Sequence, residues 1–288
     1  MVMSHAMQLG ILAIAPDGLN IARSLGCRVI ELDCEGFLGN PAEGELDIHQ
    51  ACSLREALAA DGISLSALAY YGLAQFNPSL DDLATTYRRV FAAAEALGAP
   101  VVATMGGFDA SRDWSGNLDL FTERFTRLTE LAEMIGLKLA IENWMGIHTR
   151  LPHRPKNIGG SPATWDELFE RVASSALGIE FDPSHLHWQG IDYLRATREY
   201  ASRIYHVHAK DVVDLPEERY RYGAGLDTYR WRTPGEGEID WTRFVDVLRS
   251  TGYDGAIVIE HEDERYTGDR FDEGYRRAFA HLKPLIAE

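Results

Sequence analysis

The sequence has few of the features that mark a disulfide-bonded, exported or membrane-bound protein. It contains only three cysteines, Cys27, Cys34 and Cys52, and no two of them form a Cys-x-x-Cys pair. A disulfide framework is therefore not expected, and the three thiols are interpreted as reduced packing residues. No run approaches the roughly 18 consecutive apolar residues of a membrane-spanning helix, and the N-terminus lacks a basic stretch followed by a long apolar one. We expect a cytoplasmic protein without a membrane segment.

Basic residues are also scarce. The chain has 28 Lys and Arg against 44 Asp and Glu, which gives a net charge of -16. Nucleic acids and anionic membrane surfaces require basic patches, so neither is expected as a partner. Apolar residues make up 45% of the 288 residues, enough for a large core. We expect one folded domain over residues 1–288.

Several well-known functional motifs are missing. The first apolar run is not followed by Gly-x-Gly-x-x-Gly, which disfavours a dinucleotide-binding doubly wound sheet. The sequence also contains no Gly-x-x-x-x-Gly-Lys-[Ser/Thr], Gly-x-Ser-x-Gly or His-Glu-x-x-His. The fold and site must therefore be sought in the hydrophobic pattern.

That pattern alternates short apolar runs with amphipathic stretches, at a spacing typical of repeated βα units. Strands are expected at 8–15, 28–32, 64–70, 100–104, 139–142, 179–182, 204–208 and 256–260. The main helices are expected at 47–60, 79–97, 118–135, 161–175, 240–251 and 271–286. The runs are apolar enough to be buried on both faces, as parallel barrel strands are. The pattern predicts an α/β protein with a (β/α)8 TIM barrel.

One connection breaks the alternation. Residues 212–237 show neither a helical nor a strand period and are rich in tyrosine, tryptophan and arginine. A long irregular connection inside a compact domain is usually functional. We interpret this stretch as a lid loop over the active site.

Four of the expected strands end in ionisable residues: Glu142, Asp182, His208 and Glu260. The C-terminal ends of barrel strands meet on one face, where catalytic groups of such barrels lie. Three carboxylates and one imidazole suit Mn²⁺ or Mg²⁺, with Co²⁺ or Zn²⁺ feasible. Taken alone, each acid could simply cap a helix or pair with a base, but four at corresponding positions favour one divalent metal site.

Strand parity extends this prediction to neighbouring residues. Glu180 and His206 lie two residues before Asp182 and His208, so they face the same way one layer deeper, and we predict that they hydrogen-bond to each other beneath the metal. Lys210 faces inward above His208. It would either polarise a substrate oxygen or pair with Glu262.

Other residues are candidates for substrate binding. Trp144 follows the fifth strand, and the loop 146–160 is unusually basic and carries His148. Arg230 and Arg232, in the expected lid, would bind a substrate oxyanion or phosphate, although surface ion pairing is the commoner use of arginine. A solvated surface position is likewise the simpler interpretation of His148.

Five strings carry a family resemblance: Ile141-Glu142-Asn143, Phe181-Asp182-Pro183-Ser184-His185, His206-Val207-His208-Ala209-Lys210-Asp211, Pro234-Gly235-Glu236-Gly237-Glu238-Ile239-Asp240-Trp241 and Ile259-Glu260-His261-Glu262-Asp263. From about residue 135 onward they resemble the sugar phosphate isomerase/epimerase family of xylose-isomerase-like barrels. The resemblance implies metal ligands at Glu142, Asp182, His208 and Glu260, and a substrate contact at His185. It further implies that Glu142 and Glu260 act as the acid/base pair of an isomerase or epimerase that forms an enediolate.

The resemblance includes a second branch, whose members are catalytic subunits of deglycosylases acting on 3-oxo-glycosides. In that branch, proton removal beside the ketone would drive β-elimination of the aglycone, with His148 or His153 protonating a phenolic leaving group and a small second subunit as partner. Asp214 stands where ketose epimerases carry an arginine, which disfavours simple ketohexose epimerisation. An endonuclease of AP sites, a non-catalytic sugar-binding barrel and a homo-oligomer are further alternatives.

Overall fold

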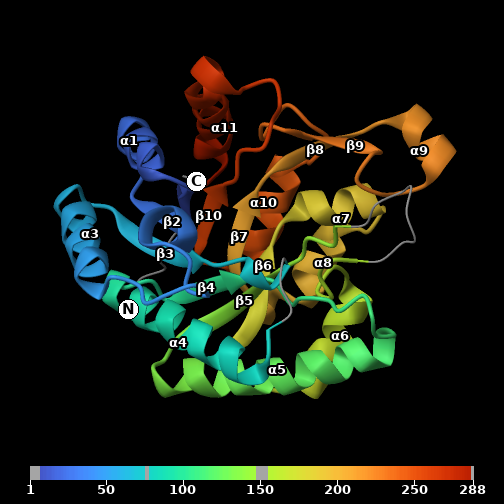
Figure 1. Ribbon diagram of the computed structural model, residues 1–288. Helices are drawn as coiled ribbons and strands as arrows, with labels where there is room; N and C mark the ends of the chain where they lie inside the picture. The colour runs from blue at the N-terminus through green and yellow to red at the C-terminus, as the bar shows by residue number, and fades with distance from the viewer. Residues whose placement is uncertain (1–6, 75–77, 147–154, 287–288) are drawn as a thin grey trace.

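Eight parallel strands close into a barrel, as predicted, in the order β1-β10-β7-β6-β5-β4-β3-β2 (Figure 1). The structure is a computed structural model and describes residues 7–74, 78–146 and 155–286. The barrel strands are β1 Gln8–Ala13, β2 Val29–Asp33, β3 Ser64–Ala69, β4 Val101–Thr104, β5 Lys138–Glu142, β6 Leu177–Phe181, β7 Ile204–Ala209 and β10 Ala256–Ile259. Each expected strand is present, and its ends differ from the prediction by at most a few residues.

Helices surround the barrel (Figure 1). They are α1 Pro16–Leu25, α2 Cys34–Leu38, α3 Ile48–Ala60, α4 Leu80–Leu97, α5 Trp114–Met134, α6 Pro162–Arg171, α7 Pro183–Gln189, α8 Tyr193–Glu199, α9 Pro216–Tyr222, α10 Trp241–Ser250 and α11 Phe271–Ile286, with short 3₁₀ turns at η1 Gly72–Ala74, η2 Ala201–Arg203 and η3 Gly268–Arg270. Ser79 caps α4 by accepting from Asp82 N, as its spacing predicts. Among the described residues, none of these helices has the length and apolar character that spanning a membrane would require.

The barrel interior is mostly lined by small apolar side chains. By parity with Glu31, Glu142 and Glu260, the inward positions of the strands include three clusters of buried apolar residues, mostly alanine and valine: Val29, Ala256 and Val258; Ala67, Val101 and Ala140; Leu12, Ala69 and Ala103. Larger apolar residues point outward and pack under the helices in the main core. Small inward side chains leave room at the barrel axis for the ionisable residues of the C-terminal end.

The expectation of an irregular stretch at 212–237 is wrong. This part of the chain contains β8 Asp211–Asp214 and β9 Tyr229–Arg232, which pair antiparallel, and α9 between them (Figure 1). Register pairs Asp211 with Arg232 and Asp214 with Tyr229. The strands are only four residues long, so their alternation is too brief to be recognised in the sequence.

Asp211 fastens this hairpin to the barrel. Its fully buried carboxylate accepts hydrogen bonds from the backbone N–H groups of Gly235, Gly237 and Ile239 and from Trp241 Nε1, at 2.9 to 3.2 Å. A Cβ on Gly237 would lie 2.2 Å from Asp211 Oδ1, so the close approach requires glycine there. The Pro-Gly-x-Gly-Glu string therefore wraps the aspartate that directly follows Lys210.

Candidate active site

The four predicted metal ligands converge at the C-terminal end of the barrel. Glu142 ends β5, Asp182 and Glu260 directly follow β6 and β10, and His208 lies near the end of β7. One ligand atom from each of the four lies within 4.8 Å of those of the others. Asp182 and His208 are completely buried and Glu142 nearly so. The convergence of side chains from four separate strands is what the strand-end pattern predicts.

Local structure aims Asp182 at this point. Its Oδ1 accepts from Ser184 N at 2.8 Å and so caps α7, which Pro183 begins. The Asn143 side chain holds the backbone of residue 182 from the other side, since its amide donates to Asp182 O and its oxygen accepts from Asp182 N. The second carboxylate oxygen, Oδ2, is left to face the other candidate ligands.

The site fits a divalent cation. Within the described residues, Asp182 Oδ2 and His208 Nδ1 are buried atoms without a hydrogen-bond partner, although such atoms are normally satisfied in proteins. His208 Nδ1 lies 3.1 Å from Glu260 Oε2 and 3.7 Å from Glu142 Oε1. Three carboxylates with one imidazole form a mostly oxygen donor set that suits Mn²⁺ or Mg²⁺ and also accommodates Zn²⁺.

His185 and Lys210 border the four residues. His185 Nε2 lies 3.2 Å from Glu142 Oε1 and 3.4 Å from Asp182 Oδ2, because one turn of α7 carries it back over the strand ends. Lys210 Nζ lies 2.7 Å from Glu260 Oε2 and 3.0 Å from Glu262 Oε2. The predicted Lys210–Glu262 pair is therefore present, together with a shorter contact to Glu260.

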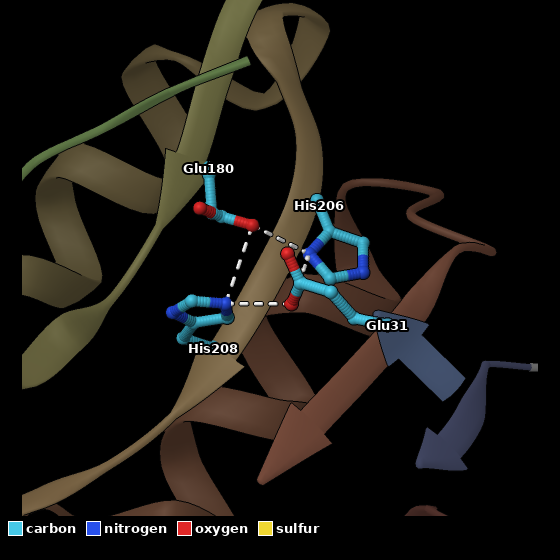
Figure 2. A group of neighbouring side chains, drawn as sticks. All are labelled: Glu31, Glu180, His206 and His208. Carbon is cyan, nitrogen blue, oxygen red and sulfur yellow. Dashed lines mark hydrogen bonds and ion pairs between the residues drawn. The ribbon is translucent and has the colours of Figure 1, made fainter. Parts of the chain in front are cut away.

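Beneath the candidate ligands lies a second group of buried side chains (Figure 2). His206 Nδ1 and Glu180 Oε1 are 2.9 Å apart, which is the predicted hydrogen bond. Tyr71 donates to Glu180 Oε2 at 2.7 Å. Glu31, which the sequence did not point to, reaches from β2 to within 2.8 Å of His208 Nε2. One ring nitrogen of His208 thus faces the other candidate ligands, and the other ring nitrogen faces the buried group beneath them.

The charges in this region shift one another's pKa values. Burial disfavours the charged form of Glu142, but the neighbouring His185 and His208 outweigh it and hold the pKa of Glu142 well below its usual range. Burial also opposes ionisation of Glu260, yet Lys210 and His208 lower its pKa to about 2. For His208 and Lys210 burial is outweighed by the surrounding carboxylates, which raise both pKa values well above normal. The surrounding carboxylates therefore favour the charged forms of both basic groups.

A cavity of about 510 Å³ opens above these residues. Its lining combines acidic, basic and aromatic side chains: Tyr71, Met105, Glu142, Trp144, Lys156, Lys210, Leu226, Trp231, Glu260 and Glu262. Trp144, the predicted substrate-binding residue, is among them. Trp231 of β9 covers the inner edge, with its ring 5.1 Å from the His185 ring and 4.6 Å from Lys210 Nζ. Aromatic faces beside acidic groups suit a polyhydroxylated ring.

The other substrate-binding candidates lie further out. Arg230 borders a neighbouring pocket that shares Trp231 and Glu262 with the main cavity, and its Nε is 3.9 Å from Glu264 Oε1. Arg232 Nη1 is 3.7 Å from the same oxygen and 3.8 Å from Asp263 Oδ1. Within the described part of the chain, the main cavity is lined by neither arginine. His148 and His153 lie outside the described residues.

Sequence reasoning missed Glu31, Tyr71 and Trp231. Glu31 carries the clearest signal, because it is the one charged residue inside the run Val29-Ile30-Glu31-Leu32. A lone carboxylate in the middle of a buried strand needs a buried partner. Tyr71 lies just beyond β3, and Trp231 belongs to the hairpin that was expected to be irregular.

Comparisons with known proteins agree with this architecture. A stretch of 147 residues is 26% identical to an inosose dehydratase of Clostridium perfringens and covers 49% of this chain and 46% of the relative. The chain thus spans about half the length of the curated relatives it matches.

Two solved structures share the fold over nearly the whole chain. The IolI protein with a bound zinc atom has a TM-score of 0.75 at 18% identity and covers 98% of both chains. The 3-keto-D-glucoside 4-epimerase YcjR of E. coli has a TM-score of 0.71 at 15% identity, over 96% of this chain and 99% of its own.

A family model for xylose isomerase-like TIM barrels matches residues 19–285. This match takes in all of the barrel but β1, together with the four strand ends that carry the candidate ligands. The chain belongs to the xylose isomerase-like TIM barrel family.

Proposed function

We propose that the protein is a divalent-metal-dependent isomerase or epimerase that removes a proton next to the carbonyl of a sugar or related polyol ketone and so forms an enediolate. The observation that carries the proposal is the placement of Glu142 and Glu260 at the floor of one cavity, where both face Nδ1 of His208. In the barrel order, β10 and β5 are separated by β7 and β6. Because these strands are not neighbours, we expect the two carboxylates to approach a bound ring from different sides, as proton transfer on two faces requires.

The candidate metal ligands are Glu142, Asp182, His208 and Glu260, with Mn²⁺ as the expected ion and Mg²⁺, Co²⁺ or Zn²⁺ as alternatives. A divalent ion held there would polarise the substrate carbonyl and stabilise the negative charge of the enediolate. Supporting this part, the structural neighbour IolI holds zinc.

The proton steps fall to residues of this chain. Glu142, whose pKa is held low by His185 and His208, takes the proton from the carbon next to the carbonyl. His185, 3.2 Å away, is placed to pass that proton on. On the other side Lys210 carries a proton 2.7 Å from Glu260 Oε2 and supplies the one that Glu260 returns to the carbon. One proton leaves the substrate and one enters, so the product is an isomer.

A second candidate is a lyase that completes β-elimination from the same enediolate. In that reaction Glu142 takes the proton, the bond from the β-carbon to its oxygen breaks, and Lys210 protonates the departing oxygen. The buried ammonium of Lys210 at the cavity wall favours this outcome, as does the relative named inosose dehydratase. Elimination of an aglycone from a 3-oxo-glycoside is the form that the deglycosylase resemblance suggests, with a small second subunit that would copurify.

Proton exchange in heavy water tests the shared step and separates the outcomes. The Mn²⁺-loaded protein is incubated in D₂O with keto-sugars, cyclic polyol ketones and 3-oxo-glycosides, and the products are followed by NMR. Deuterium next to the carbonyl together with an epimer or isomer supports the first candidate; an unsaturated ketone supports the lyase.

The matched variants are Glu142→Gln and Glu56→Gln, which make the same substitution in the site and at an exposed position of α3. Glu142→Gln is expected to lose turnover by about 10² to 10⁴-fold while still binding substrate, whereas Glu56→Gln retains full turnover. Binding of a sugar without deuterium exchange in the wild type would instead identify a non-catalytic sugar-binding barrel.

A further inference from the structure

Glu31 is a fully buried carboxylate in the middle of β2, where its backbone neighbours are Leu12 of β1 and Ala67 of β3. Its side chain crosses the barrel interior toward β7, and β1 and β10 lie between β2 and β7 in the wall. Neither strand pairing nor helix capping explains a carboxylate at this position. Its contacts within the interior must account for it.

Those contacts centre on His208 (Figure 2). Glu31 Oε2 lies 2.8 Å from His208 Nε2, and Glu180 Oε1 lies 3.2 Å from the same nitrogen. The other ring nitrogen, Nδ1, faces Glu260 and Glu142 at the cavity floor. The imidazole therefore stands between two pairs of carboxylates, one pair on each of its nitrogens.

A neutral imidazole carries one N–H, and the nitrogen that binds a cation must be the unprotonated one. A carboxylate at Nε2 holds the proton there and leaves the Nδ1 lone pair free. It also fixes the ring orientation and makes the ligating nitrogen more basic.

Glu31, rather than Glu180, is placed for this task. Both oxygens of Glu180 already accept short hydrogen bonds, from Tyr71 Oη and from His206 Nδ1. Glu31 Oε2 makes its shortest contact with His208, and Oε1 has no hydrogen-bond partner in the part of the chain that the structure describes. His206 is in turn held from its far side by Ser66 Oγ, 2.9 Å from Nε2.

We propose that Glu31 is a positioning residue that accepts the Nε2–H of His208 across the barrel interior and so presents Nδ1 to a divalent cation held with Glu142, Asp182 and Glu260. The proposal rests on the metal site of the proposed function. Under this proposal, a residue of β2 controls the metal affinity of the site, although none of the four candidate ligands lies on β2.

The test measures Zn²⁺ and Mn²⁺ affinity by competition with a chelator in the wild type, in Glu31→Gln and in Glu35→Gln. The control makes the same substitution at an exposed residue of the adjoining α2. Glutamine keeps the size of the side chain but removes its charge, so Glu31→Gln is expected to bind both metals about tenfold or more weakly. Circular dichroism verifies that the metal-free variants are folded, and Glu35→Gln keeps wild-type affinity.

NMR of ¹⁵N-histidine in the Zn²⁺-loaded wild type supplies a readout of the His208 tautomer that does not depend on affinity. The proposal expects a metal-bound Nδ1 and a protonated Nε2 in His208, with the Nε2–H signal shifted in Glu31→Gln. The opposite tautomer overturns the proposal. The proposal is also overturned if the wild type binds the metals tightly and Glu31→Gln binds them with the same affinity. That result leaves the proposed function unaffected. Failure of the wild type to bind either metal removes the metal site itself, and this role of Glu31 with it.

Discussion

Lys210 offers the most informative substitution, because its ammonium is the cation that faces most of the carboxylates at the cavity floor. Nζ lies 2.7 Å from Glu260, 3.0 Å from Glu262 and 3.4 Å from Asp182, and the side chain is only 3% exposed. Lys210→Met keeps much of the apolar stem and removes the charge. The negative charges of Asp182 and Glu260 then repel each other, because the positive charge between them has been removed.

Removing one partner of a buried ion pair costs about 3–5 kcal/mol. Because Glu262 is 45% exposed, its ion pair with Lys210 contributes little to stability. We therefore expect a loss of about 3 kcal/mol in the metal-free protein, at the lower end of this range. In a chain of this size, that corresponds to a fall in Tm of roughly 6 °C. A divalent ion would supply the missing positive charge, so Mn²⁺ should raise the Tm of Lys210→Met more than that of the wild type.

Differential scanning fluorimetry with and without Mn²⁺ measures both effects. Lys283→Met, at an exposed position of α11, is the matched control and should change Tm little in either condition. The reasoning is refuted if metal-free Lys210→Met melts no lower than the control, or if Mn²⁺ shifts wild type and variant equally.

Two further outcomes follow from the buried carboxylates. Asp211→Asn should lower the free energy of unfolding by about 2–4 kcal/mol in urea titrations, because an amide cannot accept all the hydrogen bonds that hold the hairpin. The control Asp254→Asn, at an exposed position near β10, should change the free energy of unfolding by less than about 0.5 kcal/mol. Equal losses of stability in both variants would contradict this role of Asp211. Burial, then Glu180, raise the pKa of Glu31 from 4.5 to about 7. The folded metal-free protein therefore binds more protons than the unfolded chain between these pH values, and the stability contributed by Glu31 falls as the pH rises through that window. The difference in unfolding free energy between the wild type and Glu31→Gln should decrease by up to about 3 kcal/mol from pH 4.5 to 7. If the unfolding free energies of the two proteins change with pH in parallel, this prediction is wrong.

The barrel and the candidate ligands were predictable because they depend on regular patterns. Apolar runs repeated at a βα spacing predict the strands, and inward parity together with the strand ends brings Glu142, Asp182, His208 and Glu260 to one point. The same parity correctly predicted the Glu180–His206 hydrogen bond. These predictions needed only the direction of side chains on neighbouring strands.

Contacts that cross the barrel or depend on irregular chain paths were not predictable. Glu31 reaches His208 from a strand that is not adjacent to β7, and its sequence neighbourhood gives no sign of which partner it meets. The β8–β9 hairpin is short, and the Asp211 carboxylate that holds it is satisfied by N–H groups more than 20 residues away. Trp231 reaches the cavity only because of that hairpin.

The most direct test of the central claim is the metal content of the purified protein. Elemental analysis after incubation with Mn²⁺ and gel filtration should find about one divalent ion per chain in the wild type. The Asp182→Asn, His208→Ala double variant, which loses two of the four candidate ligands, should hold almost none. Equal metal content in the two proteins would contradict the account and, with it, the enediolate chemistry proposed for this barrel.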